Sequence, residues 1–184
     1  QAKWPLLIFL HGMGECSTKM SLTSAVNAHG PIAEIQKEKF GVPMVILEPQ
    51  NACNATAADL DGFIDYAINH YNIDDNRLYL TGLSMGGGGV AGYLDSYPAR
   101  LAAAMPLSAN AEYKGWNTTP QILLDNAVSI WGAVAKNDTT VPPADTIDLA
   151  TWEPNKLGVK FGSGGVYQDY PGTISTLYAD LTSK

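Results

Sequence analysis

The stretch Gly-Leu-Ser-Met-Gly at residues 82–86 constrains the fold of this chain more than any other feature. It stands between residues 77–81, an apolar run typical of a buried strand, and residues 87–97, which suit a helix. A serine at so tight a strand-to-helix turn has a strained backbone and needs small residues two positions away on both sides. Gly82 and Gly86 meet that need. The pattern therefore predicts that Ser84 stands at the tip of the turn as a nucleophile.

Strand and helix patterns alternate along the rest of the chain. Strands are expected at residues 6–10, 44–47, 77–81, 102–107, 128–135 and 166–170, and helices at residues 31–39, 57–71, 87–97 and from about 173. The first strand is apolar throughout, as expected of a strand that is covered on both faces. This alternation predicts an α/β fold with a doubly wound, mostly parallel sheet in three αβα layers. The 184 residues are expected to form a single domain, residues 1–184.

Composition excludes several classes of function. The net charge is −7, from 11 basic and 18 acidic residues, and no basic run is present, which argues against a nucleic-acid partner. No apolar run approaches the roughly 18–20 residues that cross a bilayer, so no membrane partner is expected. No Cys/His cluster has the spacing of metal ligands, and the glycine-rich residues 162–165 lack the Lys and Ser/Thr of a phosphate-binding loop. We therefore expect neither a metal nor a cofactor.

The two cysteines, Cys16 and Cys53, are compatible either with one disulfide or with two free buried thiols. Each follows a predicted strand by a few residues. Loops that follow adjacent parallel strands lie at the same edge of a sheet, which favours the bond. A disulfide would in turn favour a secreted or otherwise extracytoplasmic location.

The first predicted strand runs directly into His-Gly-Met-Gly-Glu at residues 11–15. The glycines on both sides of Met13 let the backbone approach a substrate closely. With the turn at Ser84, the N–H groups of Met13 and Met85 are predicted to form an oxyanion hole. Taken alone, residues 11–15 could equally be an ordinary strand-to-helix turn.

Asp138 lies just after the predicted strand at residues 128–135. In a Ser-Asp-His triad of this chain order the acid follows the nucleophile, and Asp138 stands where that acid is expected. The alternative is an aspartate on a solvated loop.

Six segments together carry a resemblance to a known family: residues 7–15, 29–33, 46–50, 77–87, 138–142 and 170–172. The chain resembles the polyhydroxybutyrate-depolymerase-like carboxylesterases, which are also labelled predicted peptidases and are related to feruloyl and acetyl-xylan esterases. The resemblance implies an α/β-hydrolase sheet, a Ser-Asp-His triad and a small ester or acylated carbohydrate as substrate. It also implies that the usual hairpin before the first strand is lacking here.

The chain departs from the family at the catalytic histidine. The family carries this residue shortly after a Tyr-Pro-Gly segment, whereas here residues 170–172 are followed by Thr173, with Ser175 near the expected position. The family also tends to have His-Gly before its catalytic aspartate, where this chain has Val134 and Ala135. All three histidines of the chain, His11, His29 and His70, precede the predicted nucleophile.

A serine hydroxyl needs a positioned base, and loss of one triad member leaves roughly 10³–10⁴-fold catalysis over water. We expect His70 at the surface of its helix and His11 in a structural role beneath the oxyanion loop. His29, in a loop after the first strand, is the candidate substitute base. The chain is therefore expected to be a serine carboxylesterase for small acyl esters. The alternatives are a hydrolase-like binding module that has lost turnover and a peptidase, for which a missing histidine is most damaging.

Overall fold

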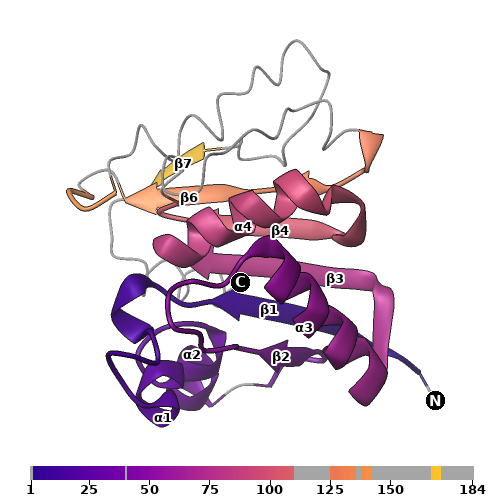
Figure 1. Cartoon of the computed structure of the whole chain (residues 1–184), viewed down its shortest axis with the longest axis horizontal. Coiled ribbons are helices and arrows are strands. Elements are labelled where there is room, and N and C mark those ends of the chain that lie inside the picture. Colours follow the sequence, from indigo (N-terminus) through magenta and orange to yellow (C-terminus); the bar gives the residue numbers. More distant parts are fainter. Residues whose placement is uncertain (1, 40, 110–124, 136–137, 142–166, 171–184) are drawn as a thin grey trace.

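A computed structural model describes residues 2–39, 41–109, 125–135, 138–141 and 167–170 of the chain. Its centre is a seven-stranded sheet in the order β2-β1-β3-β4-β6-β7, with β5 paired to β4 (Figure 1). The strands are β1 (Trp4–Leu10), β2 (Val45–Leu47), β3 (Ile73–Leu83), β4 (Ala103–Leu107), β5 (Ser129–Ile130), β6 (Gly132–Ala135) and β7 (Tyr167–Tyr170). Each of these pairings is parallel.

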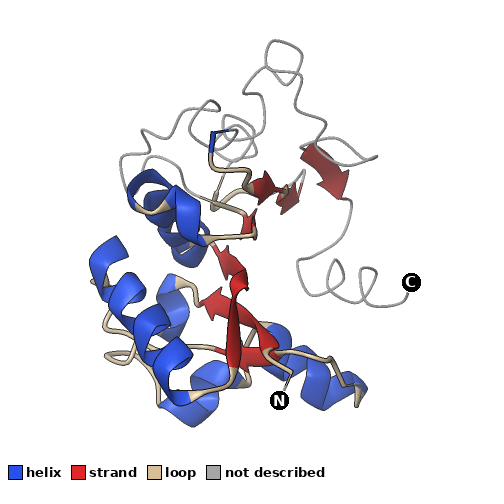
Figure 2. Ribbon diagram, turned by 90° about the vertical axis from the view of Figure 1, so that its right-hand side faces the viewer, coloured by secondary structure: helices blue, strands red, loops and turns tan. Residues whose placement is uncertain are grey.

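The helices are η1 (Met13–Glu15), α1 (Leu22–Val26), α2 (Pro31–Glu38), α3 (Ala57–His70), α4 (Met85–Ser96) and η2 (Pro98–Arg100). Helices lie on both sides of the sheet (Figure 2). The predicted fold class, a parallel α/β sheet between helical layers, is confirmed. No helix in the described part of the chain combines the length and the apolar character needed to cross a bilayer.

The order of the strands creates a crevice between β1 and β3. From β1 the chain moves outward to β2 and then returns to pair β3 on the other side of β1. At such a switch point, loops leave neighbouring strands toward opposite faces, and ligands bind at the carboxyl ends of those strands. The register pairs Leu10 with Gly82, so the loop after β1 and the turn after β3 begin at the same level.

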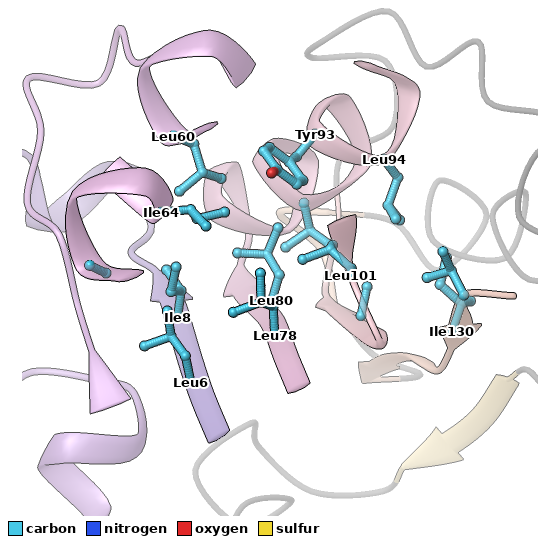
Figure 3. Close-up of a cluster of buried hydrophobic side chains, with 14 of the residues drawn as sticks. Leu6, Ile8, Leu60, Ile64, Leu78, Leu80, Tyr93, Leu94, Leu101 and Ile130 are labelled. Carbon is cyan, nitrogen blue, oxygen red and sulfur yellow. The ribbon is translucent and has the colours of Figure 1, made fainter. Parts of the chain in front are cut away.

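Helices α3 and α4 cover one face of the sheet with a continuous apolar core (Figure 3). A capping box between Thr56 and Asp59 fixes the start of α3. The helix then buries Leu60 and Ile64, which have the spacing of one helical face, against side chains of β1 and β3. This packing fixes the position of α4 on the sheet, and therefore also the position of the turn that precedes α4.

A polar network joins α3, α4 and η2 beside this core. The buried Tyr93 donates its hydroxyl to Asp61 at 2.8 Å, and Arg100 contacts Asp61 at 2.7 Å and Asp65 at 2.8 Å. Burial, followed by the hydrogen bond to Asp61, raises the pKa of the Tyr93 phenol, which stays protonated as a donor. The network closes the end of α4 that lies away from the turn at Ser84.

Several predicted boundaries differ from the structure. The single strand expected at residues 128–135 is divided into β5 and β6, with Trp131 between them. The strand before the turn begins earlier than expected, at Ile73, because its first residue pairs with Trp4 at the start of β1. The three short helices η1, α1 and η2 carry too few residues to show a periodicity. The helix expected from about Thr173 lies outside the described residues.

Candidate active site

The backbone at Ser84 has the strained conformation that the sequence predicted. Its φ is 57° and its ψ is −114°, and it immediately precedes α4. A side chain at Gly82 would place its Cβ 2.5 Å from the carbonyl oxygen of Gly86, and a Cβ at Gly86 would overlap the carbonyl oxygen of Leu10. Both glycines are therefore required by close approach of backbone to backbone.

Neighbouring backbone holds Ser84 in this conformation. Its N–H donates to the Leu107 carbonyl at 2.9 Å, and its carbonyl accepts from Gly88 N–H at 3.0 Å. The side chain is partly exposed, and within the described ranges its hydroxyl has no hydrogen-bond partner.

The loop after β1 lies directly beside Ser84. A Cβ built on the buried Gly12 would lie 3.8 Å from the Cβ of Ser84. Met13 begins η1 and Met85 begins α4, and the first N–H groups of a helix have no partner within that helix. The structure therefore brings together the two segments that were predicted to supply oxyanion donors.

His11 supports this loop from beneath and is itself buried. Its Nδ1 lies 2.8 Å from the Gly12 carbonyl, and its Nε2 accepts the Asn51 N–H at 3.1 Å. The acceptor role of Nε2 assigns the proton to Nδ1, so the imidazole is neutral and both nitrogens are occupied. The structure thus gives His11 the supporting role that the sequence suggested.

A disulfide and a glutamine join the loop after β2 to the loop after β1. Cys16 and Cys53 form the disulfide, with their Cα atoms 5.4 Å apart. Their sulfur atoms lie 3.2 and 3.7 Å from the Met13 carbonyl oxygen. Gln50 donates from Nε2 to the carbonyls of Glu15, at 2.8 Å, and Met20, at 3.0 Å. The backbone on both sides of Met13 is therefore fixed.

The side chain of Glu15 is a site feature that the sequence reasoning missed. It is 6% exposed, and its Oε1 lies 3.0 Å from Nδ1 of His29. Its Oε2 lies 3.0 Å from a Cβ built on Gly12, the same atom position that lies 3.8 Å from Ser84. The buried carboxylate thus links His29 to the loop beside Ser84. Its place two residues after Met13 was the available signal.

Asp138 lies at the carboxyl end of β6, on the same sheet edge as Ser84 and with β4 between the two strands. Its Oδ1 accepts from the N–H groups of Thr140 at 3.0 Å and Val141 at 2.9 Å. Oδ2 has no hydrogen-bond partner among the described residues. The carboxylate is therefore held by one oxygen and presents the other. Ser175 lies outside the described ranges.

Ser108 is a second feature that the sequence reasoning missed, and no sequence signal marks it. It is 2% exposed with a φ of 41°, and its N–H donates to the Ala133 carbonyl at 2.8 Å. Its buried hydroxyl has no hydrogen-bond partner in the part of the chain that is described. It directly follows Leu107, the residue that anchors Ser84. Within the same part of the chain, no group of three potential ligands could hold a metal ion.

No family model matches this sequence, and no curated protein does. Solved structures do match, among them a thermostable esterase with 25% identity and a TM-score of 0.66, covering 96% of this chain and 48% of that one. The chain has the α/β-hydrolase fold. The chain spans about half the length of the thermostable esterase.

Two further neighbours are matched over the whole of this chain. An S-formylglutathione hydrolase from Staphylococcus aureus has 18% identity and a TM-score of 0.66, with 100% of this chain and 82% of that one covered. A ferulic acid esterase has 16% identity and a TM-score of 0.63, with coverages of 100% and 83%. At these identities the likeness concerns the fold alone.

Proposed function

We propose that this α/β-hydrolase is a serine carboxylesterase that hydrolyses small acyl esters, including acetyl or feruloyl esters of polysaccharide. The observation that carries the proposal is the conformation of Ser84, whose hydroxyl stands at a strained turn beside Gly12. Strain at such a turn is costly and persists where it orients a reacting group. The ferulic acid esterase and the thermostable esterase among the structural neighbours support the ester class.

In the proposed reaction, Ser84 Oγ attacks the carbonyl carbon of the ester and gives its proton to a base. The N–H groups of Met13 and Met85 hold the negative oxygen that forms, and one such donor is worth about 10²–10³ in rate. The bond between the carbonyl carbon and the alcohol oxygen then breaks, and the alcohol leaves with the proton. Water attacks the acyl-serine in the second half, which releases the acid and restores Ser84.

His29 is the proposed base, and Glu15 is its positioning residue. The carboxylate of Glu15 lies 3.0 Å from Nδ1 of His29, which assigns the proton to Nδ1 and leaves Nε2 as the basic atom. The side chain of His29 is 53% exposed and that of Glu15 is 8% exposed, so a rigid acid holds an accessible imidazole. Asp138, which lies at the same edge of the sheet as Ser84, is the proposed second carboxylate of the site.

The disulfide supports a proposed location outside the cytoplasm. Cys16 and Cys53 are bonded in the loops that frame the site, and disulfides form and persist in oxidising compartments. We therefore propose that this esterase is secreted or otherwise extracytoplasmic.

The decisive experiment compares hydrolysis of 4-nitrophenyl acetate by the natural chain with Ser84→Ala, His29→Ala and His70→Ala. Ser84→Ala should reduce turnover to the background rate. His29→Ala should reduce it by about 10²–10⁴, the usual worth of a general base. His70 is exposed on α3 and bonded to the Tyr66 carbonyl at 2.8 Å, so His70→Ala is the matched control and should leave turnover unchanged. Equal effects at both histidines would contradict the role of His29.

A second candidate function is a binding module without turnover. The observation that favours it is the sequence itself, because no histidine follows Ser84 and residues 134–135 replace the family's His-Gly. The same assay separates the two functions. Equal background rates for the natural chain and Ser84→Ala would favour the binding module over the esterase.

A further inference from the structure

A cavity of about 400 Å³ lies behind the turn at Ser84. Its walls come from the end of β1, from α3, from α4 and from the loop after β2, and its larger apolar side chains include Leu10, Leu60, Phe63 and Met85. Pockets for small ligands range from roughly 300 to 1,000 Å³ and are mostly apolar. The cavity therefore has the size and character of a site for a small apolar group.

The glycines of α4 keep this cavity open. Gly86, Gly89 and Gly92 line it at three-residue intervals along one side of the helix. Gly86 is required by the carbonyl of Leu10, but a Cβ at Gly89 would meet only the mobile end of the Leu10 side chain, at 3.1 Å. Glycine within a helix costs about 1 kcal/mol relative to alanine. Because packing does not require it, glycine at position 89 is best explained by the space it leaves.

The cavity adjoins both halves of the proposed oxyanion hole. His11, two residues before Met13, and Met85 both line it. A carbonyl bound between the N–H groups of Met13 and Met85 would therefore lie close to the cavity wall at Met85.

Several polar groups of the cavity are already hydrogen-bonded within the protein. Thr56 donates its hydroxyl to Asp59 Oδ2 at 2.7 Å, and Asn51 Oδ1 accepts the Cys53 N–H at 2.7 Å. A ligand there gains mainly by burial of apolar surface. The carboxylate of Asp59 also disfavours an anionic occupant, so the cavity suits a neutral ester over the acid that its hydrolysis releases.

We propose that this cavity binds the apolar acyl group of the substrate, a short alkyl chain or a single aromatic ring. The inference rests on the proposed esterase function and narrows its substrate class. Acyl groups larger than acetyl would pass Met85 and fill the space above Gly89.

The test compares Gly89→Leu, which fills the cavity, with Gly62→Leu as the matched control. Gly62 is an exposed glycine of α3 with no atom within 4 Å of an added Cβ. Gly89→Leu should lower kcat/KM for 4-nitrophenyl hexanoate and benzoate by about 10-fold or more, with acetate changed less than about 2-fold. Gly62→Leu should alter none of the three. An equal loss on acetate and hexanoate, or no loss on either, would overturn the inference.

A smaller variant guards against misfolding of Gly89→Leu. Gly89→Ala adds one methyl group and removes the helix penalty of glycine. It should raise the melting temperature and still lower kcat/KM selectively for the larger esters. A more stable variant with unchanged selectivity between acetate and hexanoate would overturn the inference.

A binding measurement can distinguish failure of this inference from failure of the proposed function. Ligand-detected NMR would measure binding of ethyl benzoate to Ser84→Ala with and without Gly89→Leu. Binding that is lost only with Gly89→Leu supports the cavity even if no ester is hydrolysed, and in that case the proposed function alone fails. Absence of binding to Ser84→Ala overturns the inference even if 4-nitrophenyl acetate is hydrolysed.

Discussion

The N–H of Ser84 donates to the carbonyl of Leu107 at 2.9 Å. This bond extends the pairing of β3 with β4 by one residue beyond its last register pair, Leu83 with Leu107. The end of β4 therefore helps to hold Ser84 at a φ of 57°. The conformation of the proposed nucleophile therefore depends on the sheet. Substitutions that disturb the packing around Ser84 should lower both stability and activity.

Gly86→Ala should destabilise the fold strongly and abolish ester hydrolysis. The new Cβ would overlap the Leu10 carbonyl and lie 2.8 Å from the His11 carbonyl, and neither backbone group can yield as a side chain would. We expect a loss of roughly 3 kcal/mol in the free energy of unfolding, measured by urea denaturation. Gly62→Ala, in open space on α3, is the control and should not be destabilised. A Gly86→Ala chain as stable as the natural one would contradict the close approach of Gly86 to the Leu10 carbonyl.

Removal of the disulfide should impair both stability and the oxyanion loop. Cys16 and Cys53 are 37 residues apart in sequence, and closing such a loop is worth about 3–4 kcal/mol. We expect Cys16→Ser with Cys53→Ser to unfold at lower urea concentration. We also expect it to lose turnover, because the sulfurs no longer pack on the Met13 carbonyl. Full turnover after reduction of the natural chain with dithiothreitol would contradict this role of the disulfide.

Glu48→Gln should change how stability depends on pH. Burial raises the pKa of Glu48 to about 7, although its Oε1 accepts the Ile32 N–H at 2.9 Å. Because the pKa of this carboxyl is raised from its usual 4.5, its contribution to stability is complete below pH 4.5. That contribution is lost as the pH rises through about 7. Glutamine keeps the acceptor and cannot ionise.

The variant Glu48→Gln should therefore be more stable than the natural chain at pH 8. Because the side chain is partly exposed, we expect a gain of only about 1–2 kcal/mol. Melting temperatures measured from pH 4 to pH 8 would check this. The natural chain should lose stability across that range relative to the variant, and parallel curves would contradict the assignment.

Tyr93→Phe should cost about 1 kcal/mol, measured by urea denaturation. It removes the hydroxyl that donates to Asp61 at 2.8 Å while the carboxylate keeps Arg100. Tyr66→Phe is the matched control, because Tyr66 is 52% exposed, and this variant should be neutral. Equal effects of the two variants would show that the buried hydroxyl adds nothing.

The local patterns of the sequence were enough to place the turn and most of the sheet. Gly82 and Gly86 are required by contacts within the turn and with the adjacent strand, so their spacing carries the information directly. The apolar runs of β1 and β3 are long enough to show that they are buried. The division of β5 from β6 at Trp131 depends on pairing with β4, which no local pattern records.

The contacts that complete the site could not be read from the sequence. Glu15 and His29 are 14 residues apart, and their pairing depends on how the chain returns from α1 toward α2. The cavity likewise depends on how closely α3 approaches α4, and only its glycines are visible in the sequence. The position of Asp138 after a predicted strand, in chain order behind Ser84, suggested its role, and the structure adds that one of its oxygens is anchored.

Covalent trapping tests the central claim, that Ser84 is an activated nucleophile, most directly. The natural chain would be treated with a fluorophosphonate, digested and analysed by mass spectrometry, beside Ser84→Ala and His29→Ala. The account predicts one phosphonylated peptide carrying Ser84, slower labelling in His29→Ala and none in Ser84→Ala. Labelling of another residue at the same rate in all three chains, or no labelling of Ser84 in the natural chain, would contradict it.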